Sequence, residues 1–130
     1  SGNDAIDTME SEVNIYNSFL YNSKDKGISA GENSNVKVIK TILKDNNVGL
    51  ASKDNSFVMV SNSVFDSNNF QLEAYSKNLQ YGAPGTINLN NSKLIANQNI
   101  VTSKDNSVII IEKSEVQGDL KKTGKVKIIE

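Results

Sequence analysis

Short apolar segments recur along the chain at an almost constant spacing. Ile6, Ile28, Leu50 and Leu72 lie 22 residues apart, and Val101 follows after 29 residues, which is 22 plus an insertion of seven. A second set follows an in-out-in pattern, with apolar residues at both outer positions of the triplets 13–15, 36–38, 58–60, 87–89 and 109–111. Alternation with a period of two is typical of a strand with one buried face. The pattern therefore predicts short strands in a repeat.

Further columns of side chains follow the same period. One column is apolar and consists of Leu20, Leu43, Phe65, Leu94 and Val116. A hydroxyl column runs beside it, at Ser18, Thr41, Ser63, Ser92 and Ser114. Amide or acid side chains stand near the ends of the units, at Asn46, Asn68, Asn97 and Asp119. We expect the apolar columns to form a narrow core and the polar columns to stack in or beside turns.

This repeat predicts an all-β solenoid, because self-similarity at such a period marks stacked units. A leucine-rich repeat would need its L-x-x-L-x-L spacing, and a helical repeat would need an apolar stripe with a period of 3.6; neither occurs. We predict a single-stranded, right-handed parallel β-helix of about five coils of ~22 residues with three strands each. The predicted domain covers residues 3–130. Ser1 and Gly2 are interpreted as a cleavage scar, so we expect the chain to be a piece of a longer protein.

The composition removes several classes of function. The 14 basic residues, all lysine, face 15 acids, so there is no basic field for nucleic acid and no arginine to clamp phosphate. Cysteine, histidine and tryptophan are absent, which excludes disulfides, Cys/His metal sites and histidine acid–base chemistry. No segment approaches the ~18 apolar residues of a membrane span. We expect neither nucleic-acid binding nor membrane insertion.

The string SKDNS occurs twice, at residues 52–56 and 103–107. The spacing of 51 residues is 22 plus 29, so both copies fall at the turn between the first and second strands, two coils apart. Their residue types favour a turn selected for its backbone conformation, with lysine and aspartate exposed. The alternative is one functional site written twice.

Residues 75–86 form the single insertion in the repeat and contain the only proline. The sequence of residues 82–85, GAPG, favours a shaped loop. The insertion emerges at the same edge as both SKDNS turns, and function in solenoids tends to lie on such loops. The resulting candidate ligand-binding patch comprises Lys53, Asp54, Tyr75, Lys77, Tyr81, Lys104 and Asp105. The alternative is a loop folded back so that its tyrosines cover apolar side chains.

Carboxylates offer a weaker set of candidates. Asp54 and Asp105 are two coils apart, about 9–10 Å, which would permit an inverting glycosidase pair, but the insertion would lie between them. Asp4, Asp7 and Glu10 are weak candidates for a calcium site, although the same residues suit ordinary turns. No cofactor is otherwise expected.

The two ends of the repeat differ. Residues 120–130 break the spacing and are dense in lysine, and we interpret them as a short, irregular last coil whose charges discourage pairing at an open sheet edge. Residues 3–7 enter a first strand without a cap. We expect that end to be prone to association, and it could serve in a homodimer or in self-assembly.

The segment DKGISAGENSNVKVIKTILKDNNVGLASKDNSFVMVSNSVF resembles the repeats of right-handed parallel β-helix proteins of the pectin-lyase-like superfamily. The segments NDAID, DKGISAGE and AYSKNLQYG are also similar to repeat blocks of large bacterial extracellular proteins, some with a spore-coat-type kinase domain. The resemblance implies a non-catalytic module at a bacterial surface or in a secreted protein. Such a module would be a spacer or would contact a polysaccharide or another protein. The alternative it leaves open is a fragment of a polysaccharide-active lyase, hydrolase or epimerase.

Overall fold

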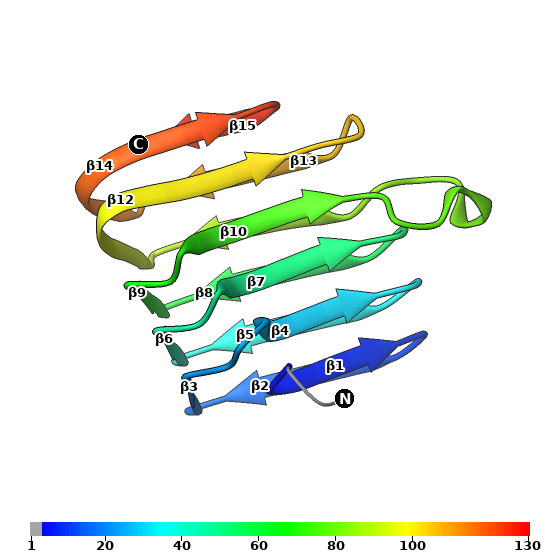
Figure 1. Cartoon of the computed structure of the whole chain (residues 1–130), viewed down its shortest axis with the longest axis horizontal. Helices are drawn as coiled ribbons and strands as arrows, with labels where there is room; N and C mark the ends of the chain where they lie inside the picture. The colour runs from blue at the N-terminus through cyan, green and yellow to red at the C-terminus, as the bar shows by residue number, and fades with distance from the viewer. Residues whose placement is uncertain (1–3) are drawn as a thin grey trace.

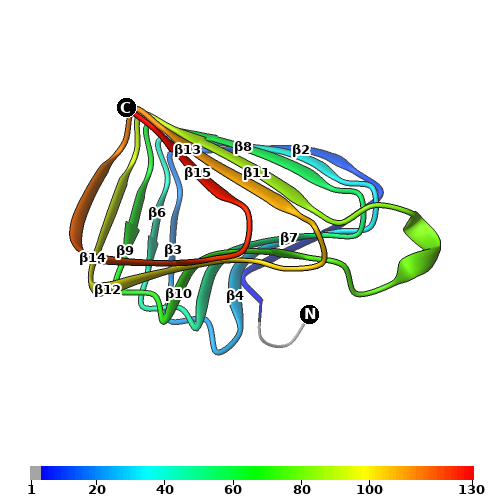
Figure 2. The ribbon, with the colours of Figure 1, turned by 90° about the horizontal axis from the view of Figure 1, so that it is seen from above.

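The computed structural model describes residues 4–130, so Ser1, Gly2 and residue 3 lie outside the described part. The chain winds into stacked coils, and each coil contributes one strand to each side of a solenoid (Figure 1). Seen from above, the coils lie over one another, each slightly displaced from the last, with a roughly triangular outline (Figure 2). The prediction of an all-β parallel solenoid of about five coils is confirmed.

Three columns of strands form the sides of the solenoid. The first contains β1 (Ile6–Met9), β4 (Lys26–Gly31), β7 (Val48–Lys53), β10 (Phe70–Tyr75) and the end of β12 (Lys93–Ser103). The second contains β2 (Glu12–Tyr16), β5 (Asn35–Ile39), β8 (Phe57–Ser61), β11 (Thr86–Asn90), β13 (Val108–Glu112) and β15 (Val126–Ile129). The third contains β3 (Phe19–Tyr21), β6 (Ile42–Lys44), β9 (Val64–Asp66), the start of β12 and the start of β14 (Glu115–Thr123). A 3-10 turn, η1 (Leu79–Tyr81), lies in the insertion.

The strands pair in parallel with the register that the sequence spacing predicts. Ile6 pairs with Ile28, Ile28 with Leu50, Leu50 with Leu72, and Leu72 with Val101 across the insertion. The strands of the second column form a six-stranded sheet. The first and third columns are joined into one nine-stranded sheet, because β12 and β14 each run through the corner between them.

The core consists of the three predicted apolar columns. Leu43, Phe65 and Leu94 of the third column, and Ile28, Leu50 and Leu72 of the first, have no exposed surface. Parallel stacking places equivalent side chains about one strand spacing, ~4.8 Å, apart. Because apolar side chains of successive coils must stack on one another to be buried, the apolar positions repeat in register.

The hydroxyl column forms a ladder at the corner between the second and third columns. Ser63 Oγ accepts a hydrogen bond from the backbone N–H of Thr41 in the coil below, at 3.1 Å, and donates to the carbonyl of Ser61, at 2.9 Å. Ser92 and Ser114 repeat the arrangement in later coils. The predicted stacking of these side chains is confirmed.

The prediction of an amide column is confirmed in two coils and is wrong in the next coil. Asn46 and Asn68 are buried and hydrogen-bonded to each other, at 3.0 Å. The column then continues through Gln71 to Asn99, whereas Asn97, which the spacing selects, is exposed. The cause is the backbone: β12 passes this corner as one strand with a register shift between Ile95 and Gln98, which places a later residue inside.

Residues 120–129 also join the stack. Leu120 packs against the core from the second half of β14, and β15 pairs in register with β13. No helix in residues 4–130 is long and apolar enough to cross a membrane.

Candidate functional site

Both SKDNS strings form tight turns between the first and second columns. Two consecutive residues in each turn have positive φ: Asp54 (51°) with Asn55 (63°), and Asp105 (57°) with Asn106 (61°). Asparagine and aspartate tolerate this left-handed conformation better than other residues with a β-carbon. The prediction that backbone conformation selects these residues is therefore supported by the dihedral angles.

The two aspartates of these turns differ in exposure. Asp105 is exposed, as expected, but Asp54 is only 1% exposed, so the expectation that both acids are solvated is wrong. Asp54 Oδ1 accepts hydrogen bonds from the backbone N–H groups of Lys77 and Asn78, at 2.7 and 2.8 Å. Asp54 is buried because the insertion folds over it.

The insertion is attached to the solenoid on both of its sides. On its first side, the N–H of Ser76 donates to Asp105 Oδ2 at 3.0 Å, in addition to the two bonds to Asp54. On its second side, the carbonyl of Ala83 accepts from the N–H of Asn55 at 2.7 Å. Gly85 lies so close to coil three that a β-carbon there would come within 2.0 Å of the carbonyl oxygen of Ser52.

The middle of the insertion projects from the side of the stack. Figures 1 and 2 show the loop after β10 extending beyond the other turns of the same edge. Lys77, Asn78 and Gln80 are exposed and Tyr81 is half-buried. The N–H of Gln80 donates to Asn78 Oδ1 at 3.1 Å, at the start of the 3-10 turn. The loop therefore displays a lysine, two amides and part of a tyrosine ring on a shaped backbone.

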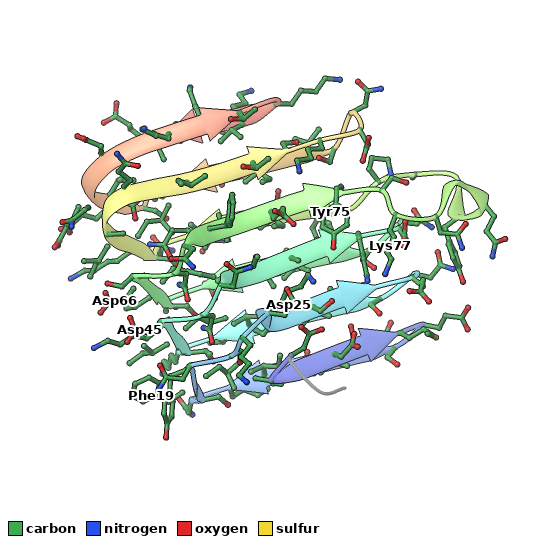
Figure 3. All side chains as sticks on the ribbon, viewed as in Figure 1. Phe19, Asp25, Asp45, Asp66, Tyr75 and Lys77 are labelled. Carbon is green, nitrogen blue, oxygen red and sulfur yellow. The ribbon has the colours of Figure 1, made fainter. Side chains whose placement is uncertain are left out.

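Tyr75 and Lys53 belong to the outward face of the first column and are neighbours in the ladder between β10 and β7. The Lys53 side chain passes over Gly31 of the coil below, where a β-carbon would come within 2.8 Å of its Cε. Figure 3 shows Tyr75 on β10 beside the root of the insertion, where Lys77 is also labelled. Lys104, another residue of the predicted patch, is exposed. It follows the end of β12, which is the next strand of the first column after β10.

An ion pair at the start of β4 was not among the predicted site residues. Lys26 Nζ lies 2.9 Å from Asp25 Oδ2, and the side chain of Lys26 is 14% exposed. Burial disfavours the charged form of Lys26, but the hydrogen bond to Asp25 and the charges of Tyr75, Asp25 and Asp4 outweigh it and raise its pKa. Burial raises the pKa of Tyr75. The charge of Lys26 lowers this pKa, whereas the carboxylates of Glu73, Asp25 and Asp54 raise it further, and the net shift is upward. An Asp-Lys dipeptide at the start of a strand carries no signal that would have revealed this environment.

Carboxylates do not converge elsewhere in the described part of the chain. In residues 4–130 there is no group of three acidic side chains that could hold a metal ion. Asp4, Asp7 and Glu10 therefore do not form the suggested calcium site. Asp4 Oδ1 instead accepts a hydrogen bond from the N–H of Lys26 at 3.0 Å.

A second surface feature lies at the corner where β12 bends. A hollow of about 550 Å³ there is lined by Ser67, Asn68, Asn69, Phe70, Ala96, Asn97, Gln98 and Ile100. A polar depression adjoins it over the earlier coils, where the side chains of Asn69 and Asn47 are hydrogen-bonded at 3.1 Å. Figure 3 shows Asp45 and Asp66 at this corner, on the side of the solenoid opposite the insertion. The abundance of asparagine at the ends of the units was the available sequence signal.

Comparison with protein-family models, with curated proteins and with solved structures finds no match to this chain.

Proposed function

We propose that this chain is a non-catalytic β-helix module of a larger bacterial surface or secreted protein, and that its insertion is a contact surface for a polysaccharide. The observation that carries the proposal is the attachment of the loop by Asp54 and Asp105. These two carboxylates fix three backbone N–H groups of residues 76–78 from turns two coils apart. A loop that is ordered before binding loses less conformational entropy when it binds.

The side chains on this loop suit a sugar. The amides of Asn78 and Gln80 and the ammonium of Lys77 are exposed, and amide and ammonium groups match the hydroxyl and carboxylate groups of polysaccharides. Tyr81 is half-buried, and the face of a tyrosine ring is an apolar surface on which a sugar ring can pack. The rest of the solenoid would hold this surface at a fixed distance from its neighbours in the parent protein.

A fragment of a polysaccharide-active enzyme has less support. A lysine that abstracts a proton needs a lowered pKa, whereas the pKa of Lys26 is raised by its pairing with Asp25. The buried carboxylate of Asp54 is occupied by two backbone N–H groups of the insertion. That arrangement suits a structural acid better than a general acid or base.

The proposal is tested by a glycan-array screen followed by titration calorimetry on the polysaccharides that bind, including uronic-acid polymers. We expect wild type to bind and Lys77→Ala/Tyr81→Ala to lose at least about tenfold in affinity. Tyr16→Ala/Lys40→Ala is the matched control, because both residues are exposed and lie at a different corner. Absence of binding by folded wild type would overturn the carbohydrate proposal, and release of cleaved product would favour an enzyme.

A further inference from the structure

Three surface depressions adjoin one another along the corner between the third and first columns. The hollow at the bend of β12, of about 550 Å³, shares Ser67 and Asn69 with the depression over the earlier coils, of about 380 Å³. It shares Ser67, Ala96 and Asn97 with a third depression, of about 330 Å³, which reaches Gln117 in the coil above. Together they form one furrow, here called the corner furrow, that runs along the stack and across the coils.

The largest part of the furrow lies where two kinds of corner meet. Coil three turns sharply after β9, with Ser67 at a φ of 58°. The next coil passes the corner within the continuous strand β12, with a register shift between Ile95 and Gln98. Such irregularities re-aim side chains, and they are common next to active sites. Here the shift places Asn99 in the interior and leaves Asn97 and Gln98 exposed in the hollow.

The corner furrow carries almost no charge. Within the described part of the chain, the residues that line the main hollow and the depression above it are all uncharged. The depression over the earlier coils contains Lys24 and Asp45, whose charges are opposite. Charged residues make up 22% of the sequence, so an uncharged furrow departs from the composition of the chain as a whole. A charged ligand would lose water here without meeting an opposite charge, which disfavours anionic and cationic ligands.

The uncharged groups of the main hollow are of two kinds. Amide side chains are exposed at Asn69, Asn97 and Gln98. An amide both donates and accepts hydrogen bonds, as the hydroxyl groups of a sugar do. Phe70 and Ile100 are half-buried and line the same hollow, so they provide an apolar wall on which the face of a sugar ring can pack. This combination suits a neutral carbohydrate.

The amides of the furrow follow the spacing of the coils. Asn69 Nδ2 donates a hydrogen bond to Asn47 Oδ1 at 3.1 Å, so equivalent amides of neighbouring coils are in contact. Successive coils are about one strand spacing, ~4.8 Å, apart, which is close to the length of one hexose residue in an extended β-1,4-linked chain. A polysaccharide laid along the furrow would therefore meet polar groups of a new coil at each sugar.

We propose that the corner furrow binds a neutral, extended polysaccharide whose axis lies along the stack, with one sugar over each coil. The exposed amides hydrogen-bond to its hydroxyl groups, and Phe70 and Ile100 pack against a ring face. The site does not rest on the proposed function of the insertion, which leaves the stack between β10 and β11 on the opposite side (Figure 1). The insertion displays Lys77, which favours acidic sugars, so the two surfaces select different glycans.

Titration of the wild-type chain with cello-oligosaccharides and manno-oligosaccharides, followed by NMR, tests the site and its direction. We expect backbone amide shifts to change in a line along the corner, at residues 45–47, 67–70, 95–98 and 117–118. Affinity should rise with each added sugar until the furrow is filled. Oligogalacturonate, which is acidic, should leave these resonances unchanged. Shifts confined to another face, equal shifts with the acidic sugar, or no shifts with either neutral series overturn the proposal.

Variants separate the furrow from the rest of the surface. Asn97→Ala/Gln98→Ala removes two exposed amides, and we expect it to lose at least about tenfold in affinity for the longest oligosaccharide that binds. Asn14→Ala/Asn35→Ala is the matched control, because it removes two exposed amides from the second column, and it should bind as wild type does. Equal affinity of the furrow variant and wild type, or an equal loss in the control, overturns the proposal.

The insertion variant Lys77→Ala/Tyr81→Ala distinguishes this site from the proposed contact surface on the loop. It leaves the furrow intact, so it should keep the neutral oligosaccharides that bind along the corner and lose only glycans bound at the insertion. Loss of the neutral oligosaccharides in this variant would place them on the insertion and overturn the furrow proposal alone.

Discussion

Asp54 Oδ1 lies 2.7 Å from the backbone nitrogen of Lys77, which belongs to the following coil. The same oxygen accepts from the next N–H, that of Asn78, at 2.8 Å. A turn residue that would otherwise face solvent is thereby converted into a buried attachment point. The insertion is held by this carboxylate, by Asp105 and, on its other side, by the hydrogen bond from the N–H of Asn55 to the carbonyl of Ala83.

Removal of this carboxylate should loosen the insertion. We expect Asp54→Gly to lower the free energy of unfolding by about 1.5–3 kcal/mol, because two hydrogen bonds to a charged acceptor are lost. Glycine adds no strain at the φ of 51°. Hydrogen exchange should show faster exchange at the amides of Lys77 and Asn78. Glu32→Gly, at a φ of 40° at the equivalent position of a turn without an insertion, is the control. Unchanged protection of both amides would show that Asp54 does not hold the loop.

The attachment of the insertion at Gly85 should be weakened by the addition of a single methyl group. In Gly85→Ala the β-carbon would come within 2.0 Å of the carbonyl oxygen of Ser52, so the loop must move away from coil three. We expect a loss of more than about 1 kcal/mol in chemical denaturation and new proteolytic cleavage in residues 76–85. Gly82→Ala meets no atom within 4 Å and has only its φ of 83° to accommodate. Equal effects of the two variants would contradict the close approach at Gly85.

The hydroxyl ladder should stabilise the stack one coil at a time. We expect Ser63→Ala to cost about 1–3 kcal/mol, because the buried N–H of Thr41 would lose its acceptor. Urea unfolding of the variant measures this loss. Ser63→Thr retains the hydroxyl, as Thr41 does at the same position of its coil, and should stay within about 1 kcal/mol of wild type. A neutral effect of alanine would mean that another group or water replaces the acceptor.

Stability should fall at alkaline pH. The folded state raises the pKa of Lys26 above 10.5 and that of Tyr75 above 10.0, so it binds both protons more tightly than the unfolded state. The stabilisation is complete below these ordinary values and is lost as pH rises through the raised values. Melting temperatures of wild type, Lys26→Met and Tyr75→Phe from about pH 8 to about pH 11 should show a smaller alkaline decline in the variants. Lys37→Met, at an exposed position, should decline as wild type does.

Much of the fold could be predicted from the sequence, because the same side-chain pattern must recur wherever identical coils stack. Ile28, Leu50 and Leu72 are partners in the structure at the spacing that separates them in the chain. The hydroxyl ladder through Ser63 and Ser92 was predictable for the same reason, since a hydrogen bond between coils requires the same residue type at the same place.

The site was less predictable than the fold. The two SKDNS turns are identical in sequence, and yet Asp54 is buried whereas Asp105 is exposed. The difference comes from the coil above or below each turn, which local sequence does not specify. The environment of Lys26 likewise includes Tyr75, two coils away, whose charge contributes to the raised pKa of Lys26.

The sequence by itself determined the period, the three apolar columns and the turn positions, because these are periodic properties that every coil must share. Only the tertiary structure decided the departures from that period. It placed Asn99 rather than Asn97 in the interior, since β12 crosses its corner as a continuous strand. It also folded the insertion onto Asp54. Such features depend on contacts between different coils, and a repeat pattern carries no information about where its own exceptions will pack.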